Sequence, residues 1–267
     1  MKRDLYEKLY ELPIGFYQSP AEVYVQYRMK EKILKHFETV AGERKSLMIL
    51  DIGCNVGTDL FMLYLVQPEN IYLGVDISEN AIRIANRLSK LRARKVSFLV
   101  ASATALPFRK EILDLALSSE TIEHLKLPES MLLDVNKALK PKGYLILTTP
   151  NRDYLLGKLA RNLPQRVRKD LNNKSAWSLK RHSKTITADE WEKKGHVSVM
   201  SYDALARLLS LNGFEVEKTY GSSIFGGHHW LDEHPVILSL LMLLDNACSF
   251  RFAKRLHFNI ILRAKKR

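Results

Sequence analysis

The chain has 267 residues, 46% of them apolar, which is enough for a full core in one domain with insertions or in two small domains. Its 42 Lys and Arg residues outnumber 29 Asp and Glu residues, and the net charge of +13 favours acidic partners: nucleic acid, an anionic lipid surface or a phosphorylated substrate. The two cysteines, Cys54 and Cys248, lie far apart and exclude a disulfide framework, so we expect a reducing, cytoplasmic environment.

The predicted elements alternate between strand and helix over the first 150 residues. We expect helices at 20–40, 58–66, 79–91 and 128–139, and strands at 47–52, 71–76, 96–100, 112–117 and 144–149. The run Lys140-Pro141-Lys142-Gly143 is expected to stop the last of these helices. The strands are continuous apolar runs, which predicts a doubly wound α/β domain with a mostly parallel sheet covered by helices on both faces. A helix at 201–211 and strands at 214–220 and 259–263 continue the pattern.

The predicted elements also indicate how the chain is divided, because two segments, 151–195 and 222–258, fall outside the alternation of strand and helix. We expect an N-terminal helical segment at 1–45 and a core formed by 46–150 and 196–267. A basic lid insertion would occupy 151–195, and an apolar insertion would occupy 222–258 within the core. The N-terminus lacks the apolar core of a signal peptide. The most apolar window, 236–244, is shorter than the roughly 20 residues that span a bilayer.

The stretch LDIGCNVGTDL, residues 50–60, joins an apolar strand to a helix through a turn that contains glycines. In open α/β sheets, ligands bind at the carboxyl ends of the strands, where such a turn lies. A dinucleotide loop needs Gly-x-Gly-x-x-Gly, and two of its three glycines are absent when the pattern starts at Gly53. A loop for S-adenosylmethionine (SAM) has an acid before Gly-x-Gly-x-Gly, and Asp51, Gly53 and Gly57 satisfy it except at Asn55. Asn adopts a positive φ at low cost, so Asn55 can keep the turn's shape; a weakened cofactor site is the alternative.

Asp76 ends the second predicted strand, in GVDIS. A carboxylate at this position can accept hydrogen bonds from both ribose hydroxyls of a nucleotide cofactor. It serves NAD and SAM equally, so it indicates a ribose without choosing between the cofactors. An ordinary Asp at the end of a strand is the alternative.

Five motifs occur in an order that resembles the class I SAM-dependent methyltransferases, especially the branch that includes ubiquinone-biosynthesis O-methyltransferases. LDIGCNVGTDL and GVDIS resemble the first two motifs, and three more follow: ASATALPF (101–108), SSETIEHL (118–125) and LKPKGYLILTTPN (139–151). HVSVMSYDALARLLSLNGFEV (196–216) resembles the return of the chain to the sheet. The resemblance implies a Rossmann-like, seven-stranded sheet whose last strand runs antiparallel.

The resemblance also implies a SAM site whose product is S-adenosylhomocysteine. It implies these cofactor-binding residues: Asp51, Gly53, Cys54, Asn55, Gly57, Asp76, Ile77, Ser102, Ala103 and Ser119. Asp76 would hold the ribose hydroxyls, and Ile77 would pack on the adenine. Ser102 departs from the family, which often has Asp there. A serine hydroxyl can still accept a hydrogen bond from the adenine amino group with less charge assistance, or the Ala103 backbone does more of the binding.

Candidate catalytic residues cluster in SSETIEHLKLP, after the fourth predicted strand. Glu120, Glu123 and His124 lie within one or two helical turns, and His124 can act as a general base near neutral pH. In the ubiquinone O-methyltransferases this stretch resembles a metal site, which would make the three residues Mg²⁺ ligands, although His is a poor ligand for so hard a cation. A third interpretation is that Glu123 and His124 only cap a helix and anchor a loop.

Four residues are candidates for contact with the acceptor. His196 precedes the sixth strand unit, and His228 and His229 follow two glycines that could let a loop close over the site. Trp177 lies in the basic insertion, where residues 151–184 carry ten Lys or Arg and two Asp, a net of +8, interleaved with apolar side chains. Such a composition suits recognition of an anionic acceptor, contact with an acidic membrane, or stacking and phosphate contacts with RNA; a solvated lid is the alternative.

The composition of the apolar insertion, 222–258, favours an apolar or lipid-linked acceptor. The stretch 235–256 is apolar on nearly every side at first and then turns basic, which is typical of a helix that is buried, at a homodimer contact, or against lipid. The chain also lacks the Asn/Asp-Pro-Pro-Tyr signature that is typical of methylation of exocyclic amines in nucleic acid. We therefore expect a SAM-dependent methyltransferase acting on oxygen of a small-molecule acceptor, anionic or lipid-linked, with peripheral membrane contact. The alternatives are an RNA methyltransferase and a catalytically silent SAM-fold scaffold.

Overall fold

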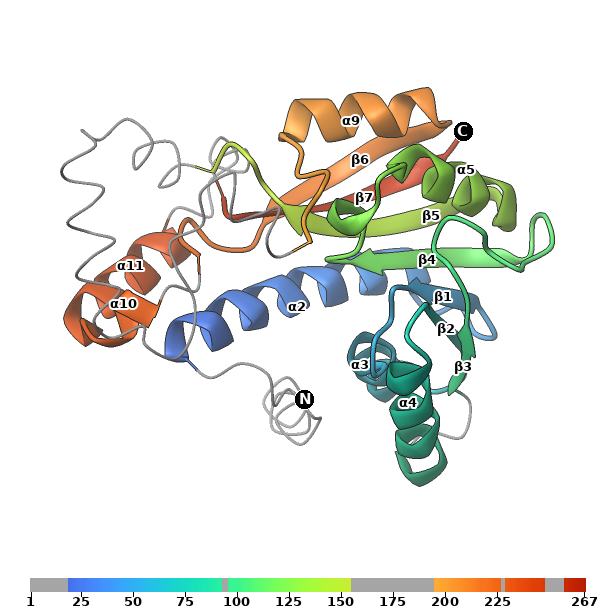
Figure 1. Ribbon diagram of the computed structural model, residues 1–267, viewed down its shortest axis with the longest axis horizontal. Helices are drawn as coiled ribbons and strands as arrows, with labels where there is room; N and C mark the ends of the chain where they lie inside the picture. The colour runs from blue at the N-terminus through green and yellow to red at the C-terminus, as the bar shows by residue number, and fades with distance from the viewer. Residues whose placement is uncertain (1–18, 93–95, 155–194, 227–228, 248–256) are drawn as a thin grey trace.

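The computed structural model describes residues 19–92, 96–154, 195–226, 229–247 and 257–267, and Figure 1 shows their arrangement. The strands are β1 (Met48–Ile52), β2 (Ile71–Asp76), β3 (Val96–Val100), β4 (Leu113–Ser119), β5 (Leu139–Pro150), β6 (Phe214–Gly221) and β7 (Asn259–Lys266). The helices are α2 (Pro20–Ala41), α3 (Thr58–Val66), α4 (Glu79–Arg92), α5 (Pro128–Ala138), α9 (Tyr202–Leu211), α10 (His229–Asp232) and α11 (Pro235–Ala247), with a 3-10 turn, η1 (Ile122–His124).

The strands form one seven-stranded sheet in the order β3-β2-β1-β4-β5-β7-β6. The first five strands pair in parallel, and β7 is antiparallel to both of its neighbours, β5 and β6. The predicted doubly wound α/β fold with an antiparallel last strand is therefore confirmed. The order reverses between β1 and β4, so the ends of these two strands form the switch point where such sheets bind ligands.

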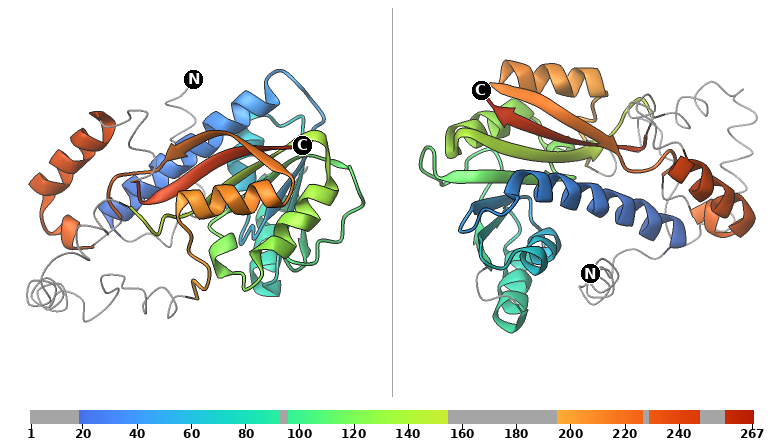
Figure 2. Two further views of the ribbon diagram at one scale, coloured as in Figure 1. Left: turned by 90° about the horizontal axis from the view of Figure 1, so that it is seen from above. Right: turned by 180° about the vertical axis from the view of Figure 1, so that it is seen from behind.

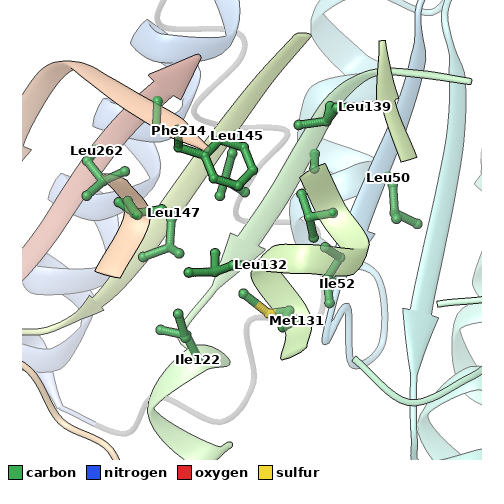
Figure 3. Packing of buried hydrophobic residues seen from close by; sticks show 14 of the residues in the cluster. Leu50, Ile52, Ile122, Met131, Leu132, Leu139, Leu145, Leu147, Phe214 and Leu262 are labelled. Carbon is green, nitrogen blue, oxygen red and sulfur yellow. The ribbon is translucent and has the colours of Figure 1, made fainter. Parts of the chain in front are cut away.

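Helices cover both faces of the sheet, and each face has its own apolar cluster (Figure 2). On one face, Phe37 of α2 and Leu60 of α3 pack against strand residues such as Ile49. On the other face, Leu132 of α5 and Phe214 pack against the central strands, as Figure 3 shows. The core thus holds β1 and β4 rigidly from both sides, and it is these two strands that present the site described below.

Most predicted boundaries agree with the structure to within two residues, but the start of β5 was wrong. The run 140–143 was expected to follow a helix as a loop, and it forms the beginning of β5 instead. Leu139 pairs with Leu113 ahead of a register shift, and Lys140 Nζ lies 2.8 Å from Asp114 Oδ2. Pairing with β4, which lies far away in the sequence, therefore extends the strand through a segment whose local composition favours a turn.

The second insertion packs on the first half of α2. Ala21 and Val25 of α2 share a cluster with Leu231 and Leu238. Asp232 Oδ1 also accepts a hydrogen bond from the Ala21 N–H at 2.9 Å. α10 and α11 thus lie beyond the sheet, at the end of the molecule toward which β4 points (Figure 1).

A buried carboxylate secures this packing. Asp245 of α11 is fully buried, and it accepts hydrogen bonds from Tyr24 Oη at 2.8 Å and from the Ile224 N–H at 2.9 Å. Arg28 Nε lies 3.3 Å from the same side chain, which supplies the countercharge. Because both carboxylate oxygens of Asp245 have partners, the inner face of α11 is fixed against α2.

The outer face of α11 is apolar and exposed. Val236 is 72% exposed and Leu243 is 65% exposed, and Leu240 and Leu244 extend the same surface. Burial within the chain, one of the three alternatives for this stretch, therefore accounts for Leu238 and not for the outer face. No helix in the described parts of the chain is long and apolar enough to cross a membrane.

Candidate active site

The carboxyl ends of four parallel strands bring the predicted motifs to one edge of the sheet. Ile52 of β1 pairs with Val75 of β2 and with Ser118 of β4. Ser119 in turn pairs with Thr148 of β5. The glycine turn, Asp76 and the SSETIEHL stretch therefore leave neighbouring strands side by side, as their order in the sequence predicts.

The turn after β1 is left-handed at three of five successive positions. Gly53, Asn55 and Gly57 have φ angles of 74°, 49° and 86°. A Cβ on Gly53 would lie 2.2 Å from Thr121 Oγ1, and one on Gly57 would lie 2.3 Å from Phe98 Cζ. Asn55 is exposed, so its side chain has room, and the prediction that Asn can keep the shape of the turn is confirmed.

Asp76 ties this turn to the end of β2. One carboxylate oxygen accepts a hydrogen bond from the Asn55 N–H at 2.9 Å, and the other accepts one from the Ser78 N–H at 2.8 Å. Ile77 is 77% exposed beside it and offers an open apolar surface. Ser102 Oγ already accepts a hydrogen bond from the Thr104 N–H at 3.2 Å, and Ala103 follows on the same loop. Together these residues can hold a ribose and a flat aromatic base.

Cys54 stabilises the glycine turn through its backbone N–H rather than through its thiol. Its side chain is buried, and burial raises the pKa of the thiol well above its usual range, so the group stays neutral. The N–H groups of Gly53 and Cys54 both donate to the Val75 carbonyl, at 2.8 and 2.9 Å. These bonds hold the turn against β2.

Behind the turn, the predicted Asp51 lies in a group of charged residues with Asp59 and Lys30, which the sequence reasoning missed. Asp51 is 2% exposed, and its Oδ1 atom has no hydrogen-bond partner among the residues that the structure describes. Burial raises the pKa of Asp51 well above its usual value; Asp59 and Asp76 raise it further, and the charge of Lys30 opposes them. Lys30 Nζ forms an ion pair with Asp59 Oδ1 at 2.5 Å. Asp59 stands in the first turn of α3, directly after the glycine turn, and that position was the available signal for it.

Glu120 lies where β4 ends and has a left-handed φ of 53°. Thr148 Oγ1 donates to one carboxylate oxygen at 3.0 Å, and Asn259 Nδ2 donates to the other at 3.0 Å. Burial raises the pKa of Glu120 to about 7, although these two hydrogen bonds oppose the shift. Ser119 Oγ lies 3.3 Å from Thr148 Oγ1 and completes this polar chain. A carboxyl group with this pKa can gain or lose a proton near neutral pH.

Glu123 is enclosed rather than open to the site. It is fully buried, and Thr149 Oγ1 donates to its Oε2 at 3.0 Å. Burial, followed by the charge of Glu120, raises the pKa of Glu123 well above its usual value. Its carbonyl accepts hydrogen bonds from the N–H groups of Val197 and Ser198. This geometry supports the anchoring role that the sequence left open for Glu123.

His124 is exposed and lies against His196. The two ring centroids are 4.6 Å apart. His124 Nδ1 lies 3.0 Å from the Gly195 carbonyl oxygen, and because a carbonyl can only accept, Nδ1 carries the proton and Nε2 keeps a lone pair. The chain segment that contains His196 thus folds back onto the β4 motif, which places the two histidines side by side after the end of β4.

Glu123, His124 and His196 offer donor atoms that all lie within 4.8 Å of one another. Two imidazoles and one carboxylate suit a nitrogen-preferring cation such as Zn²⁺ better than Mg²⁺. The predicted Mg²⁺ ligand set does not match this group: His196 takes the place of Glu120, whose two carboxylate oxygens are engaged by Thr148 and Asn259. The remaining acceptor candidates lie outside what the structure describes: Trp177, His228 and the side chain of His229.

Comparison with known proteins identifies the class to which this site belongs. Residues 43–206, more than half of the chain, match the model of a family described as "Methyltransferase domain". The chain therefore belongs to this methyltransferase family, and its cofactor is SAM. The predicted class I SAM-dependent methyltransferase is confirmed.

Individual relatives are distant. The chain is 30% identical over 158 residues to an uncharacterized protein of Methanocaldococcus jannaschii, a match that covers 58% of this chain and 72% of the relative. It is 29% identical over 126 residues to a ubiquinone biosynthesis O-methyltransferase of Pelagibacter ubique, covering 46% of this chain and 51% of that enzyme. The chain thus spans about half the length of that O-methyltransferase.

A solved structure shares the fold. It is the phosphoethanolamine N-methyltransferase 2 of Haemonchus contortus in complex with SAM, with a TM-score of 0.60 and 16% identity. The similarity covers 88% of this chain and 52% of the other. At this identity the comparison supports the fold and not the acceptor.

Substitutions of Asn55 test whether the turn is left-handed at this residue. We expect Asn55→Gly to keep the thermal stability and SAM affinity of the parent protein, because glycine adopts this φ freely. Asn55→Val should destabilise the protein by about 1–2 kcal/mol, because a β-branched side chain is strained there. Urea unfolding and calorimetric titration of SAM measure both effects; equal behaviour of the two variants would contradict the left-handed turn.

Proposed function

We propose that the protein transfers the methyl group of SAM to an oxygen atom of a small-molecule acceptor that is anionic or lipid-linked. The observation that carries the proposal is the meeting of three features at one edge of the sheet: the left-handed turn, Asp76, and the proton-accepting groups of Glu120 and His124. A cofactor held by the first two would present its sulfonium to the third.

The cofactor residues carry over from the motifs as part of this proposal. Asp51, Gly53 and Gly57 would border the methionine part, and Asp76 would accept hydrogen bonds from the ribose hydroxyls. Ile77 would pack on the adenine, which explains why so large an apolar side chain is exposed. Asp76 already holds the turn through two N–H groups, so each of its oxygens would use its remaining lone pair for the ribose.

The chemistry is a displacement at carbon. The acceptor oxygen forms a bond to the methyl carbon, the carbon–sulfur bond breaks with its electron pair moving to sulfur, and S-adenosylhomocysteine leaves. The hydroxyl proton passes to His124 Nε2 or to the carboxylate of Glu120. Because the cofactor supplies the leaving group, the residues of the protein mainly orient the reactants and accept this proton.

One relative supports oxygen as the acceptor atom: the O-methyltransferase of Pelagibacter ubique is named for ubiquinone biosynthesis. The basic residues of segment 151–184 would complement a negative charge on the acceptor.

The outer face of α11 supports a lipid-linked acceptor and peripheral contact with a membrane. Val236, Leu240, Leu243 and Leu244 are exposed on one helix, and the one acid of that helix, Asp245, is buried. In the sequence, the nine residues after α11 include three basic residues and no acid: Arg251, Lys254 and Arg255. An apolar surface next to positive charge is typical of helices that lie in the interface of an anionic bilayer.

Asp76 tests the cofactor site. We expect the parent protein to bind SAM and S-adenosylhomocysteine with micromolar affinity, and Asp76→Ala to weaken both by about 10- to 100-fold because ribose hydrogen bonds to a charged group are lost. Calorimetric titration measures the affinities. Glu79→Ala, which removes an exposed acid close by, is the matched control. No binding to the folded parent would favour the silent scaffold.

The pKa of Glu120 predicts how the affinity for SAM changes with pH. Its pKa of about 7 means that the carboxyl gains charge between about pH 6 and 8, and the ionised form attracts the sulfonium cation. SAM affinity should therefore rise severalfold across this window, whereas S-adenosylhomocysteine, which has no sulfonium, should respond less. Glu120→Gln should flatten the SAM profile. If the pH dependence of SAM affinity survives in this variant, the titrating group is not Glu120.

The membrane proposal depends on the face of α11. The protein should sediment with vesicles that contain phosphatidylglycerol and much less with pure phosphatidylcholine, and Leu243→Asp should reduce this binding at least about 10-fold because a charge enters the apolar face. Leu133→Asp, at an exposed leucine of α5, is the control. Failure to bind vesicles, with a dimer that Leu243→Asp dissociates, would assign the face to a homodimer. Salt-sensitive binding of RNA instead would favour the RNA methyltransferase.

A further inference from the structure

Asn259, the first residue of β7, contacts the carboxyl group of Glu120 where β4 ends. Asn259 is 2% exposed, and its Nδ2 atom donates a hydrogen bond to Glu120 Oε2 at 3.0 Å. In the sheet, β5 lies between β4 and β7. A residue 139 positions further along the chain therefore reaches the candidate active site from the antiparallel half of the sheet.

Ser222, which follows β6, fixes the direction in which the amide of Asn259 points. Ser222 Oγ accepts a hydrogen bond from the Asn259 backbone N–H at 3.2 Å and lies 2.8 Å from Asn259 Oδ1. Because an amide oxygen can only accept, the Ser222 hydroxyl donates to Oδ1, and the amide NH₂ group is turned toward Glu120. Ser222 is fully buried, so solvent does not compete for these bonds.

Thr148 of β5 holds the other carboxylate oxygen of Glu120. Its Oγ1 atom accepts a hydrogen bond from the Glu120 N–H at 3.1 Å, and its hydroxyl donates to Glu120 Oε1 at 3.0 Å. Each carboxylate oxygen thus accepts one hydrogen bond from a fixed donor and keeps one lone pair. Hydrogen bonds donated to a carboxylate favour its ionised form.

Charged groups on three further elements act on Glu120. Burial has the largest effect and raises the pKa of Glu120, whereas the two hydrogen bonds lower it. Both hydrogen bonds act more strongly than the charge of Lys30 on α2, which lowers the pKa, and the charge of Asp59 on α3, which raises it. Glu123 of η1 and Glu120 disfavour each other's ionisation. The hydrogen bonds are therefore the main opposition to burial.

Glu120 is also tied to the glycine turn. The next residue, Thr121, donates from Oγ1 to the Ile52 carbonyl at 3.1 Å. The same Oγ1 atom would lie 2.2 Å from a Cβ on Gly53, so the two segments are in close contact. A cofactor held by this turn would bring its sulfonium to the edge of the sheet where an ionised Glu120 attracts it.

We infer that Asn259, oriented by Ser222, is a positioning residue that holds Glu120 ionised at neutral pH and leaves one lone pair on each carboxylate oxygen for the ligands of the site. This inference deepens the proposed function and rests on it. Asn259 acts through Glu120 and needs no contact with the cofactor or the acceptor. The competing account is that Asn259 and Ser222 only join the ends of β6 and β7.

The ionisation of Glu120 can be measured without cofactor or acceptor. An NMR titration of the full chain with ¹³C-labelled glutamate carboxyl groups follows the signal of Glu120, which Glu120→Gln identifies by its loss. The midpoint should lie near pH 7 in the parent protein. Asn259→Leu should raise it by about 1 to 2 pH units, because a hydrogen bond to the ionised form is lost. Ser222→Ala should raise it by less, because the amide remains and only its orientation is released.

The affinity for SAM supplies a second readout, which a purely structural role would not move. In calorimetric titrations, Asn259→Leu should bind SAM severalfold more weakly than the parent protein at pH 7. At pH 9, where Glu120 is again largely ionised, the two affinities should agree within about twofold. S-adenosylhomocysteine, which has no sulfonium, should change less at either pH.

Asn136→Leu is the matched control, because it removes an asparagine of α5 that donates to the carbonyls of Asn212 and Gly213. It should leave the midpoint of Glu120 unchanged, and thermal unfolding shows whether each variant is folded.

An unchanged midpoint in Asn259→Leu, an equal rise in the control, or an equal loss of SAM affinity at pH 7 and pH 9 would overturn the inference. A parent protein that binds no SAM would overturn the proposed function instead, and the NMR titration would still decide whether Asn259 holds Glu120 ionised. If Asn259→Leu does not fold, the midpoint in Ser222→Ala decides, and no rise there would overturn the inference.

Discussion

The left-handed turn between β1 and α3 is the constraint on which the rest of the site depends. Backbone with positive φ at Gly53, Asn55 and Gly57 lets the chain reverse within a few residues of the strand end. Only then can the Asn55 N–H reach the carboxylate of Asp76, and only then does α3 begin with Asp59 close to Lys30. Thr121 and Phe98 fill the space that Cβ atoms on the two glycines would need, so side chains from β3 and from the end of β4 enforce the turn as well.

Several acidic side chains gather at the same edge of the sheet. Asp51 and Glu123 are buried and Glu120 is partly buried, and burial raises the pKa of all three carboxyl groups. Burying carboxyl groups in this way destabilises their ionised forms, and a fold keeps such an arrangement where a ligand offsets the cost. SAM carries two positive charges and one negative charge, so a site with several acids is matched to it more closely than to the nicotinamide dinucleotides, whose pyrophosphate is anionic.

How much the sequence predicts depends on whether a feature is local. Helix 58–66 and strands 71–76 and 96–100 were predicted with their observed bounds, because apolar runs and glycines define them within a few residues. Asn55 was also predicted from its own backbone preference. The start of β5 was wrong because pairing with β4 decides it. Lys30 could not be identified, since it lies 29 residues before Asp59 and its spacing in α2 resembles that of any lysine on an amphipathic helix. The pairing of His124 with His196 joins segments separated by an insertion, and no local pattern encodes it.

The helix α2 contacts both the glycine turn of the proposed cofactor site and the helix α11, whose exposed face is proposed to contact a membrane. It has 22 residues and is therefore about 33 Å long. Its first half holds α10 and α11 through Ala21 and through the buried Asp245, while its middle carries Lys30 to the cofactor turn. A helix with both contacts sets the exposed face of α11 at a defined position relative to the glycine turn. If α11 rests on a bilayer, the end of β4 beside His124 would be held at a defined height above the lipid, and an acceptor anchored in that bilayer would reach the methyl group with only its polar end leaving the interface.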